Sequence, residues 1–155
     1  MEIRRAAWGD TDGLLSLLSQ VLEIHHKGRP DLFKGGAVKY TREELTELLG
    51  DERAPIFVAV DGEKLLGYCF CRYLQMIDNN ILTDIKTLYI DDICVDETAR
   101  GKHVGQQLYR FTEDYARSQG CYNVTLNVWE CNPGARAFYE AMGMDVQKTG
   151  MEKIL

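Results

Sequence analysis

The chain has 155 residues, of which 45% are apolar and 27% charged, and its formal net charge is −6 at pH 7. This length and apolar content suffice for one core, so we expect residues 1–155 to form a single domain. The acidic balance excludes a general nucleic-acid binder, which needs a basic face to displace counterions. Charges interrupt every apolar run well before the roughly 20 residues that span a membrane, so we expect no membrane association.

The N-terminus and the cysteines indicate a cytoplasmic protein. The stretch MEIRRAAWGD lacks the apolar region of a signal peptide, and five cysteines fit reduced thiols better than a disulfide framework. Cys69 and Cys71 form the closest pair, but they lack the two-residue gap of a zinc knuckle. We interpret this pair as strand packing and expect no metal site.

The first third of the chain predicts an edge strand and two helices. Residues 1–6 are short and mixed, and over 10–26 apolar residues recur at the spacing of an amphipathic helix. A loop rich in glycine over 27–40 follows. Thr41 and Glu44 form a capping box, which predicts a second, short helix that ends at the next glycine.

The central third predicts three strands. The first covers 55–60 and turns at Asp61 and Gly62, a strong hairpin signal, into the second at 65–75. A polar loop separates the second strand from the third, which is centred on 87–95.

The last third alternates helix and strand again. We expect a helix over 104–119, a β-branched strand over 122–129 and a helix over 132–143. Asn132 suits the cap of that last helix, and 151–155 has the composition of a final strand. The alternation predicts an α/β fold with a mixed sheet.

The loop ARGKHVG lies between a predicted strand and a predicted helix. Free backbone N–H groups and the positive end of the helix dipole favour an anion there, and Arg100 and Lys102 add charge. Phosphate is the expected ligand, although the spacing of the loop residues matches neither a Walker loop nor the dinucleotide fingerprint. An ordinary solvated turn is the alternative.

Two segments together resemble the GCN5-related N-acetyltransferases (GNAT family), namely YIDDICVDETARGKHVGQQLY and LNVWECNPGARAFYEAMGM. Arg100 and Gly105 match the family's acetyl-coenzyme A loop, with His103 in place of its first glycine, a residue tolerated at positive φ. Asn132 and Tyr139 match the family's second motif. The resemblance covers nearly the whole chain and implies a mixed, mostly antiparallel sheet with a splayed strand pair and flanking helices.

The resemblance also implies acetyl-CoA as the cofactor. Its pantetheine arm is expected to pair with a strand end as an extra strand, and its pyrophosphate is expected on the loop. The cofactor-binding residues implied are Ile93, Cys94, Val95, Arg100, Gly101, Lys102, His103, Val104, Gly105, Asn132, Ala135 and Tyr139.

The activity implied is acetyl transfer to a primary amine of a small molecule, or to a protein lysine or N-terminus. Attack of an amine on a thioester needs a base, a donor to the oxyanion and an acid for the sulfur. By resemblance, Asp91 is the base, the Val95 backbone N–H is the donor and Tyr139 is the acid, although packing and solvated roles are alternatives. Because Asp91 and Asp92 are adjacent in one strand, we expect only one of them to face the acceptor.

The loop after the first helix is expected to line the acceptor pocket, with His25, Asp31 and Phe33 as substrate-binding candidates and surface placement as the alternative. A non-catalytic acyl-CoA-binding regulatory module is a second hypothesis. A hydrolase that uses Cys94 or Cys131 is a third, but no histidine lies near either in sequence to activate the thiol. The acceptor's identity and the oligomeric state stay open, with a homodimer as one option.

Overall fold

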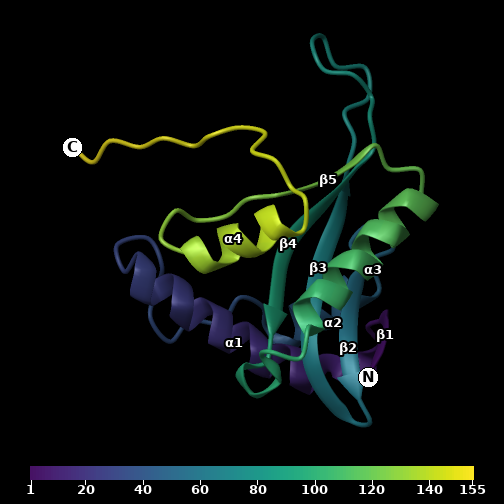
Figure 1. The fold of residues 1–155 in the computed structure, drawn as a ribbon, viewed down its shortest axis with the longest axis vertical. Coiled ribbons are helices and arrows are strands. Elements are labelled where there is room, and N and C mark those ends of the chain that lie inside the picture. Colours follow the sequence, from purple (N-terminus) through teal and green to yellow (C-terminus); the bar gives the residue numbers. More distant parts are fainter.

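The computed structural model describes residues 1–155 as a five-stranded sheet flanked by helices (Figure 1). The strands are ordered β1-β2-β3-β4-β5, and all neighbours are antiparallel except β4 and β5. The elements are β1 Glu2–Arg5, α1 Thr11–Gly28, α2 Arg42–Leu49, β2 Ile56–Asp61, β3 Lys64–Leu74, β4 Thr87–Val95, α3 Val104–Ser118, β5 Asn123–Leu126 and α4 Pro133–Ala141, with short 3-10 turns at Trp8–Asp10 and Glu97–Ala99. The mixed, mostly antiparallel sheet is the one predicted.

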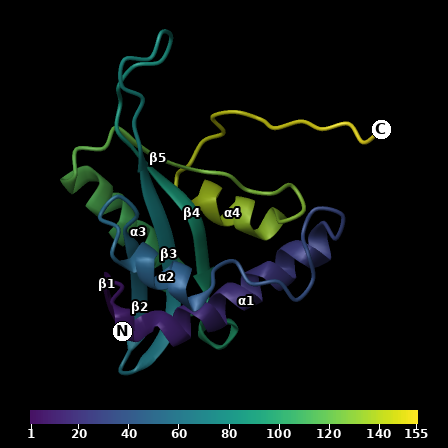
Figure 2. The same ribbon diagram turned by 180° about the vertical axis from the view of Figure 1, so that it is seen from behind.

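Helices cover both faces of the sheet, with α1 and α2 on one face and α3 on the other (Figures 1 and 2). The central strand β3 is buried on both sides: Tyr68 and Phe70 pack under α1, whereas Cys69 and Cys71 pack under α3. The two thiol sulfurs lie 3.6 Å apart in this core, which confirms the packing interpretation. No helix of the structure is long and apolar enough to cross a membrane.

Local signals place the helix ends as expected. The Thr41 hydroxyl accepts the Glu44 N–H at 3.2 Å, and the Glu44 carboxylate accepts the Thr41 N–H at 2.8 Å, so the predicted capping box is present. The Asn132 side chain caps α4 by accepting the Ala135 N–H at 3.2 Å. The predicted turn at Gly62, with φ +60°, joins β2 to β3.

The predicted final strand over 151–155 is wrong. The chain after α4 has no regular structure and extends away from the sheet (Figure 1). Met151 and Ile154 are 95% and 78% exposed, because no neighbouring strand offers them backbone partners or an apolar face. The expected strand over 122–129 is also shorter, since β5 pairs with β4 only along four residues.

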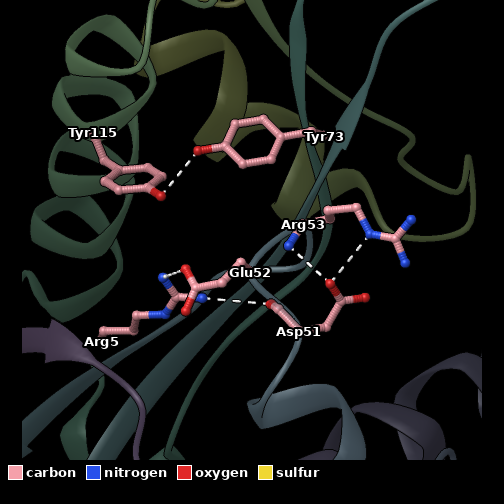
Figure 3. A network of polar contacts seen from close by, with 6 residues as sticks. All are labelled: Arg5, Asp51, Glu52, Arg53, Tyr73 and Tyr115. Carbon is pink, nitrogen blue, oxygen red and sulfur yellow. Dashed lines mark hydrogen bonds and ion pairs between the residues drawn. The ribbon is translucent and has the colours of Figure 1, made fainter.

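A polar network fastens the turn between α2 and β2 to the edge of the sheet (Figure 3). Arg5 donates to the Glu52 carboxylate at 2.9 Å and to the Asp51 carbonyl at 3.4 Å. The Arg53 backbone N–H donates to the Asp51 carboxylate at 2.9 Å. Because Glu52 is exposed, this ion pair contributes little stability, and none of these residues belongs to the candidate site below.

Candidate active site

The surroundings of β4 change halfway along the strand. Its first half, Thr87–Ile90, pairs with β3 on one side and with Asn123–Leu126 of β5 on the other. Its second half, residues 91–95, pairs with β3 alone, because the chain after β5 departs toward α4. The splayed strand pair is therefore present, and the second half of β4 keeps one free backbone edge.

A β-bulge separates the two halves. Cys71 of β3 pairs with Ile90 and Phe70 pairs with Asp92, so Asp91 has no partner in β3. An extra residue of this kind shifts the alternation of the strand. The premise that Asp91 and Asp92 lie on opposite faces of the strand is therefore wrong: the Lys39 ammonium lies 2.8 Å from an oxygen of Asp91 and 3.8 Å from one of Asp92.

The two carboxylates form part of a compact polar cluster on the α1 side of the sheet. The Tyr68 hydroxyl, fully buried, donates to Asp92 at 2.8 Å. The Lys39 ammonium lies 5.7 Å from the centroid of the Tyr40 ring. Two carboxylates and an aromatic face are the groups that bind an ammonium ion well. The arrangement is thus an ammonium site, and Lys39 fills it from the loop that precedes α2.

Burial sets the protonation of this cluster. It raises the pKa of Asp92, although Lys39 and Tyr68 act in the opposite direction. Burial lowers the pKa of Lys39, but the charges of Asp92 and Asp91 outweigh it, so the net shift is upward. A carboxyl group that holds its proton more readily than usual is a better general base than an ordinary aspartate.

Two further groups next to the open half of β4 are held neutral. Burial raises the pKa of the Tyr139 phenol, and the charges of Cys69 and Asp92 raise it further. The Tyr139 phenol is therefore protonated but is a weaker acid than an ordinary tyrosine, so a role as proton donor depends on its position. Burial also raises the pKa of the Cys94 thiol to about 12, so the thiolate that a cysteine nucleophile requires is scarce.

The loop between β4 and α3 has the shape that its sequence predicts. His103 has φ 59° and ψ 21°, so it takes the left-handed conformation expected for a glycine substitute. The Gln107 N–H makes the first helical bond, to the His103 carbonyl at 3.1 Å, and N–H groups of the first turn lack helical partners. A Cβ on Gly105 would lie 3.3 Å from a methyl carbon of Val95, so this glycine lets α3 approach β4 closely.

The other cofactor-binding candidates differ in what they offer. Arg100 and Lys102 have exposed side chains without ion pairs, which leaves their charges free for an anion. The Val104 side chain is buried in the core, so only its backbone is available. Asn132 and Ala135 bind each other in the α4 cap. Those two candidates therefore have a structural role in the cap.

An aromatic group lies beside the polar cluster. The His25 and Phe33 rings stack at 5.0 Å, and the edge of Trp129 meets Phe33 at 5.3 Å. Burial lowers the pKa of His25, which the Asp92 charge only partly offsets. Asp31 is exposed and paired with Arg29 at 2.7 Å, so the structure does not bring it to the cluster.

Sequence reasoning missed four residues of the cluster and its border. They are Lys39, Tyr40, Tyr68 and Trp129. Trp129 lies in the second segment that carries the resemblance, and the other three lie outside both segments. The loops and strands that carry the four residues meet only through the tertiary fold. The one sequence signal is that Tyr68 and Asp92 stand on predicted strands that are consecutive in the chain.

Comparison with known proteins supports the same architecture. Residues 18–144 match the family model described as Acetyltransferase (GNAT) family. A point mutant of the BH1408 protein from Bacillus halodurans is 32% identical with a TM-score of 0.95, over 100% of this chain and 99% of its own. An aminoglycoside acetyltransferase from an uncultured soil metagenomic sample, in complex with sisomicin, shares the fold with a TM-score of 0.74 at 19% identity, over 99% of this chain and 95% of its own.

Curated relatives match over shorter regions. Glucosamine 6-phosphate N-acetyltransferase of Arabidopsis thaliana is 35% identical over 79 residues, which is 50% of this chain and 51% of that protein. Glucosamine 6-phosphate N-acetyltransferase 1 of Oryza sativa subsp. japonica is 36% identical over 55 residues, 36% of this chain and 32% of that protein. The matches thus span about half the length of these relatives or less. With the family model covering most of the chain, the protein belongs to the GNAT acetyltransferase family.

Proposed function

We propose that the protein transfers an acetyl group from acetyl-CoA to a primary amine. The observation that carries this proposal is the ammonium site at the bulge of β4, where Asp91 and Asp92 hold the amine of Lys39. It lies beside the only stretch of β4 that has a free backbone edge. Family membership supports an acyl thioester as the donor.

The residues around the open half of β4 fit acetyl-CoA. The free edge of residues 91–95 offers N–H and C=O groups to the amides of a pantetheine arm. The first turn of α3 offers N–H groups to phosphate, and Arg100 and Lys102 add positive charge. Gly105 keeps side-chain atoms out of this approach. Acetyl-CoA supplies an activated carbonyl and a thiolate leaving group.

Each catalytic task has a candidate group. Asp91 and Asp92 lie within reach of an amine and take its proton, and the raised pKa of Asp92 suits it to this role. Tyr139, a phenol that is neutral at pH 7 already at the ordinary pKa of about 10, donates a proton to the leaving sulfur by virtue of its position. Backbone N–H groups of the open stretch, that of Val95 among them, polarise the carbonyl.

The acceptor is proposed to be an amine with a small apolar or ring-shaped body. Although burial lowers the pKa of the His25 imidazole, His25 is close enough to Asp92 for that charge to act in the opposite direction. Phe33 and Trp129 extend the aromatic surface of His25. Aromatic faces bind both alkyl chains and sugar rings. The glucosamine 6-phosphate N-acetyltransferases and the aminoglycoside acetyltransferase act on amino sugars by their names, which makes amino sugars the first acceptors to try. Peptide lysines and N-termini follow.

An amine panel tests the proposal. The protein is incubated with acetyl-CoA and single amines, and release of free thiol is followed over time. We expect release that depends on the amine and saturates with it. Binding of acetyl-CoA without release would favour a regulatory acyl-CoA-binding module. Repeated turnover without any amine, well beyond one thiol per chain, would favour a hydrolase.

A homodimer stays a prediction, with some support from the exposed apolar residues of the C-terminal tail, Met151 and Ile154. Light scattering after gel filtration measures the mass in solution. A dimeric mass of the full chain, together with a monomeric mass of a chain truncated after Met144, would support the homodimer. A monomeric mass of the full chain at high concentration would reject it.

A further inference from the structure

Lys39 places the chain's own primary amine where an acceptor amine is expected. Its Nζ atom donates to Asp91 at 2.8 Å, lies 3.8 Å from Asp92 and lies 5.7 Å from the Tyr40 ring centroid. These are the groups that the proposed function assigns to the acceptor. Lys39 is thus bound to the base itself, with 29% of its side chain exposed.

The loop is built to keep Lys39 there. Gly35 and Gly36, the latter with φ +65°, precede it in a segment without regular structure. The next residue, Tyr40, stacks on Phe70 of β3 with ring centroids 5.9 Å apart and an interplanar angle of 17°. The backbone is therefore anchored on the sheet directly beside the lysine, which directs its side chain to the bulge.

Other lysines lack such surroundings. The Lys27 side chain is 74% exposed, and it pairs with Glu23 of its own helix at 3.7 Å. Lys64 donates to the Thr98 hydroxyl at 2.8 Å on an exposed surface. Only Lys39 among these three combines burial with contact to a candidate base. Holding a reactant against a catalytic group replaces an encounter in solution and accelerates reaction strongly.

We propose that Lys39 is a self-acetylation site, with an acyl thioester bound at the open half of β4 as the donor. This inference rests on the proposed function, because it uses the same base and acid. The carbonyl carbon forms a bond to Nζ and its bond to sulfur breaks. The ammonium loses two protons: one passes through Asp91 to solvent and one ends on the departing sulfur through Tyr139. One thioester and one lysine yield one amide and one thiol.

Acetylation also changes the ammonium site. Acetyl-lysine is neutral, so it no longer pairs with Asp91 and Asp92. The Arg72 guanidinium, 4.0 Å from the other oxygen of Asp91, remains as a nearby positive charge. The modified lysine therefore no longer fills the ammonium site, which becomes available to an external amine.

Mass spectrometry of peptides from the full chain, incubated with acetyl-CoA and no added amine, tests this inference. We expect up to one acetyl group per chain at Lys39, with a rate that does not change when the protein is diluted. The rate should exceed that at Lys27 by about tenfold or more, since proximity favours Lys39. Lys27 and Lys64 report uncatalysed acetylation in the same sample, and protein in urea reports the rate without the fold.

Two variants sharpen the test. Asp91→Asn should slow acetylation of Lys39 and leave that of Lys27 unchanged. A merely reactive Lys39 would instead be acetylated faster, because Asp91 raises the pKa of its amine. Lys39→Arg should remove the modified peptide without shifting the acetyl group to Lys27. Circular dichroism melts of both variants check that they are folded.

The result also separates the two proposals. Amine-dependent thiol release together with Lys39 acetylation no faster than that of Lys27 would overturn self-acetylation and leave the proposed function standing. Failure of both thiol release and Lys39 acetylation, with acetyl-CoA bound, would overturn the proposed function and the inference with it. Selective acetylation that depends on Asp91 supports self-acetylation.

Discussion

The two halves of β4 belong to one strand but have different surroundings. Thr87–Ile90 is paired on both edges, and Leu88 and Ile90 are buried in the core. Residues 91–95 are paired on one edge and carry two carboxylates on one face. Full pairing and apolar burial stabilise the first half. The second half keeps backbone groups and charges free for ligands, because a bulge and a departing neighbour interrupt the sheet.

The largest expected effect concerns the proton donor beside the open half. Tyr139→Phe removes one hydroxyl, so we expect kcat to fall by about 10² to 10⁴-fold while acetyl-CoA affinity stays unchanged. Tyr109→Phe is a matched control, because Tyr109 is a buried tyrosine of α3, 4% exposed, that packs edge-on against the neighbouring Phe138. Steady-state kinetics and calorimetry measure both. Equal kcat in the wild type and Tyr139→Phe would remove the phenol from the mechanism.

The second effect concerns the approach of α3 to the open half. Gly105→Glu places a bulky anion against Val95 and at the proposed phosphate site, so we expect acetyl-CoA affinity to fall by about tenfold or more. Gly150→Glu makes the same charge change in the tail, where no atom lies within 4 Å, and should bind normally. Unchanged affinity in a folded Gly105→Glu variant would contradict the phosphate placement.

The third effect is smaller and concerns the left-handed residue that opens α3. His103→Gly should leave binding close to wild type, because glycine takes φ 59° without strain. His103→Val should lower the free energy of unfolding by about 1–2 kcal/mol, because a β-branched residue tolerates the left-handed conformation less well than histidine, and weaken binding with it. Chemical denaturation and coenzyme A titration compare the two. Equal stability of both variants would show that the loop relaxes.

The smallest effect concerns stability and pH. Because the pKa of Asp92 is raised by folding, its contribution to stability is fully present below about pH 3.9, the ordinary value, and is lost as the pH rises through the folded pKa. Asp92→Asn avoids this loss and still accepts the Tyr68 hydrogen bond. Its melting temperature at pH 7 should therefore exceed that of the wild type. The increase should be about 2–4 °C for each kcal/mol by which the free energy of unfolding rises.

Two controls frame that measurement. The difference between Asp92→Asn and the wild type should shrink toward zero near about pH 4, where both side chains are neutral. Glu52→Gln alters an exposed carboxylate of the network in Figure 3 and should change the melting temperature little at any pH. A wild type that is more stable than Asp92→Asn at pH 7 would reverse the sign and show that the ion pair with Lys39 outweighs burial.

Much of this molecule could be predicted from local sequence. Capping residues such as Thr41 and Asn132 act within one turn of their helix, so sequence alone places those ends. The loop that precedes α3 could be predicted for the same reason, including the left-handed conformation of His103. The strand pattern predicted the sheet because alternation reflects burial directly.

The rest depends on contacts between distant segments. The bulge at Asp91 arises from the register of β4 against β3, which neither strand encodes alone, and it reverses the expected facing of Asp92. Lys39 reaches the bulge from a loop without a motif, through the stacking of Tyr40 on β3. Asp31 does not reach the cluster, because its carboxylate is exposed and pairs with the Arg29 guanidinium.

Hydrogen exchange with and without acetyl-CoA tests the central claim most directly, that the open half of β4 is where the donor binds. Acetyl-CoA should slow exchange of backbone amides within 91–95. It should also slow exchange in the first turn of α3, around Gly105, because the N–H groups of that turn lack helical partners. Amides of Thr87–Ile90 should change little, because that half is already paired on both edges. Protection confined to other segments, with acetyl-CoA demonstrably bound, would contradict this placement of the site.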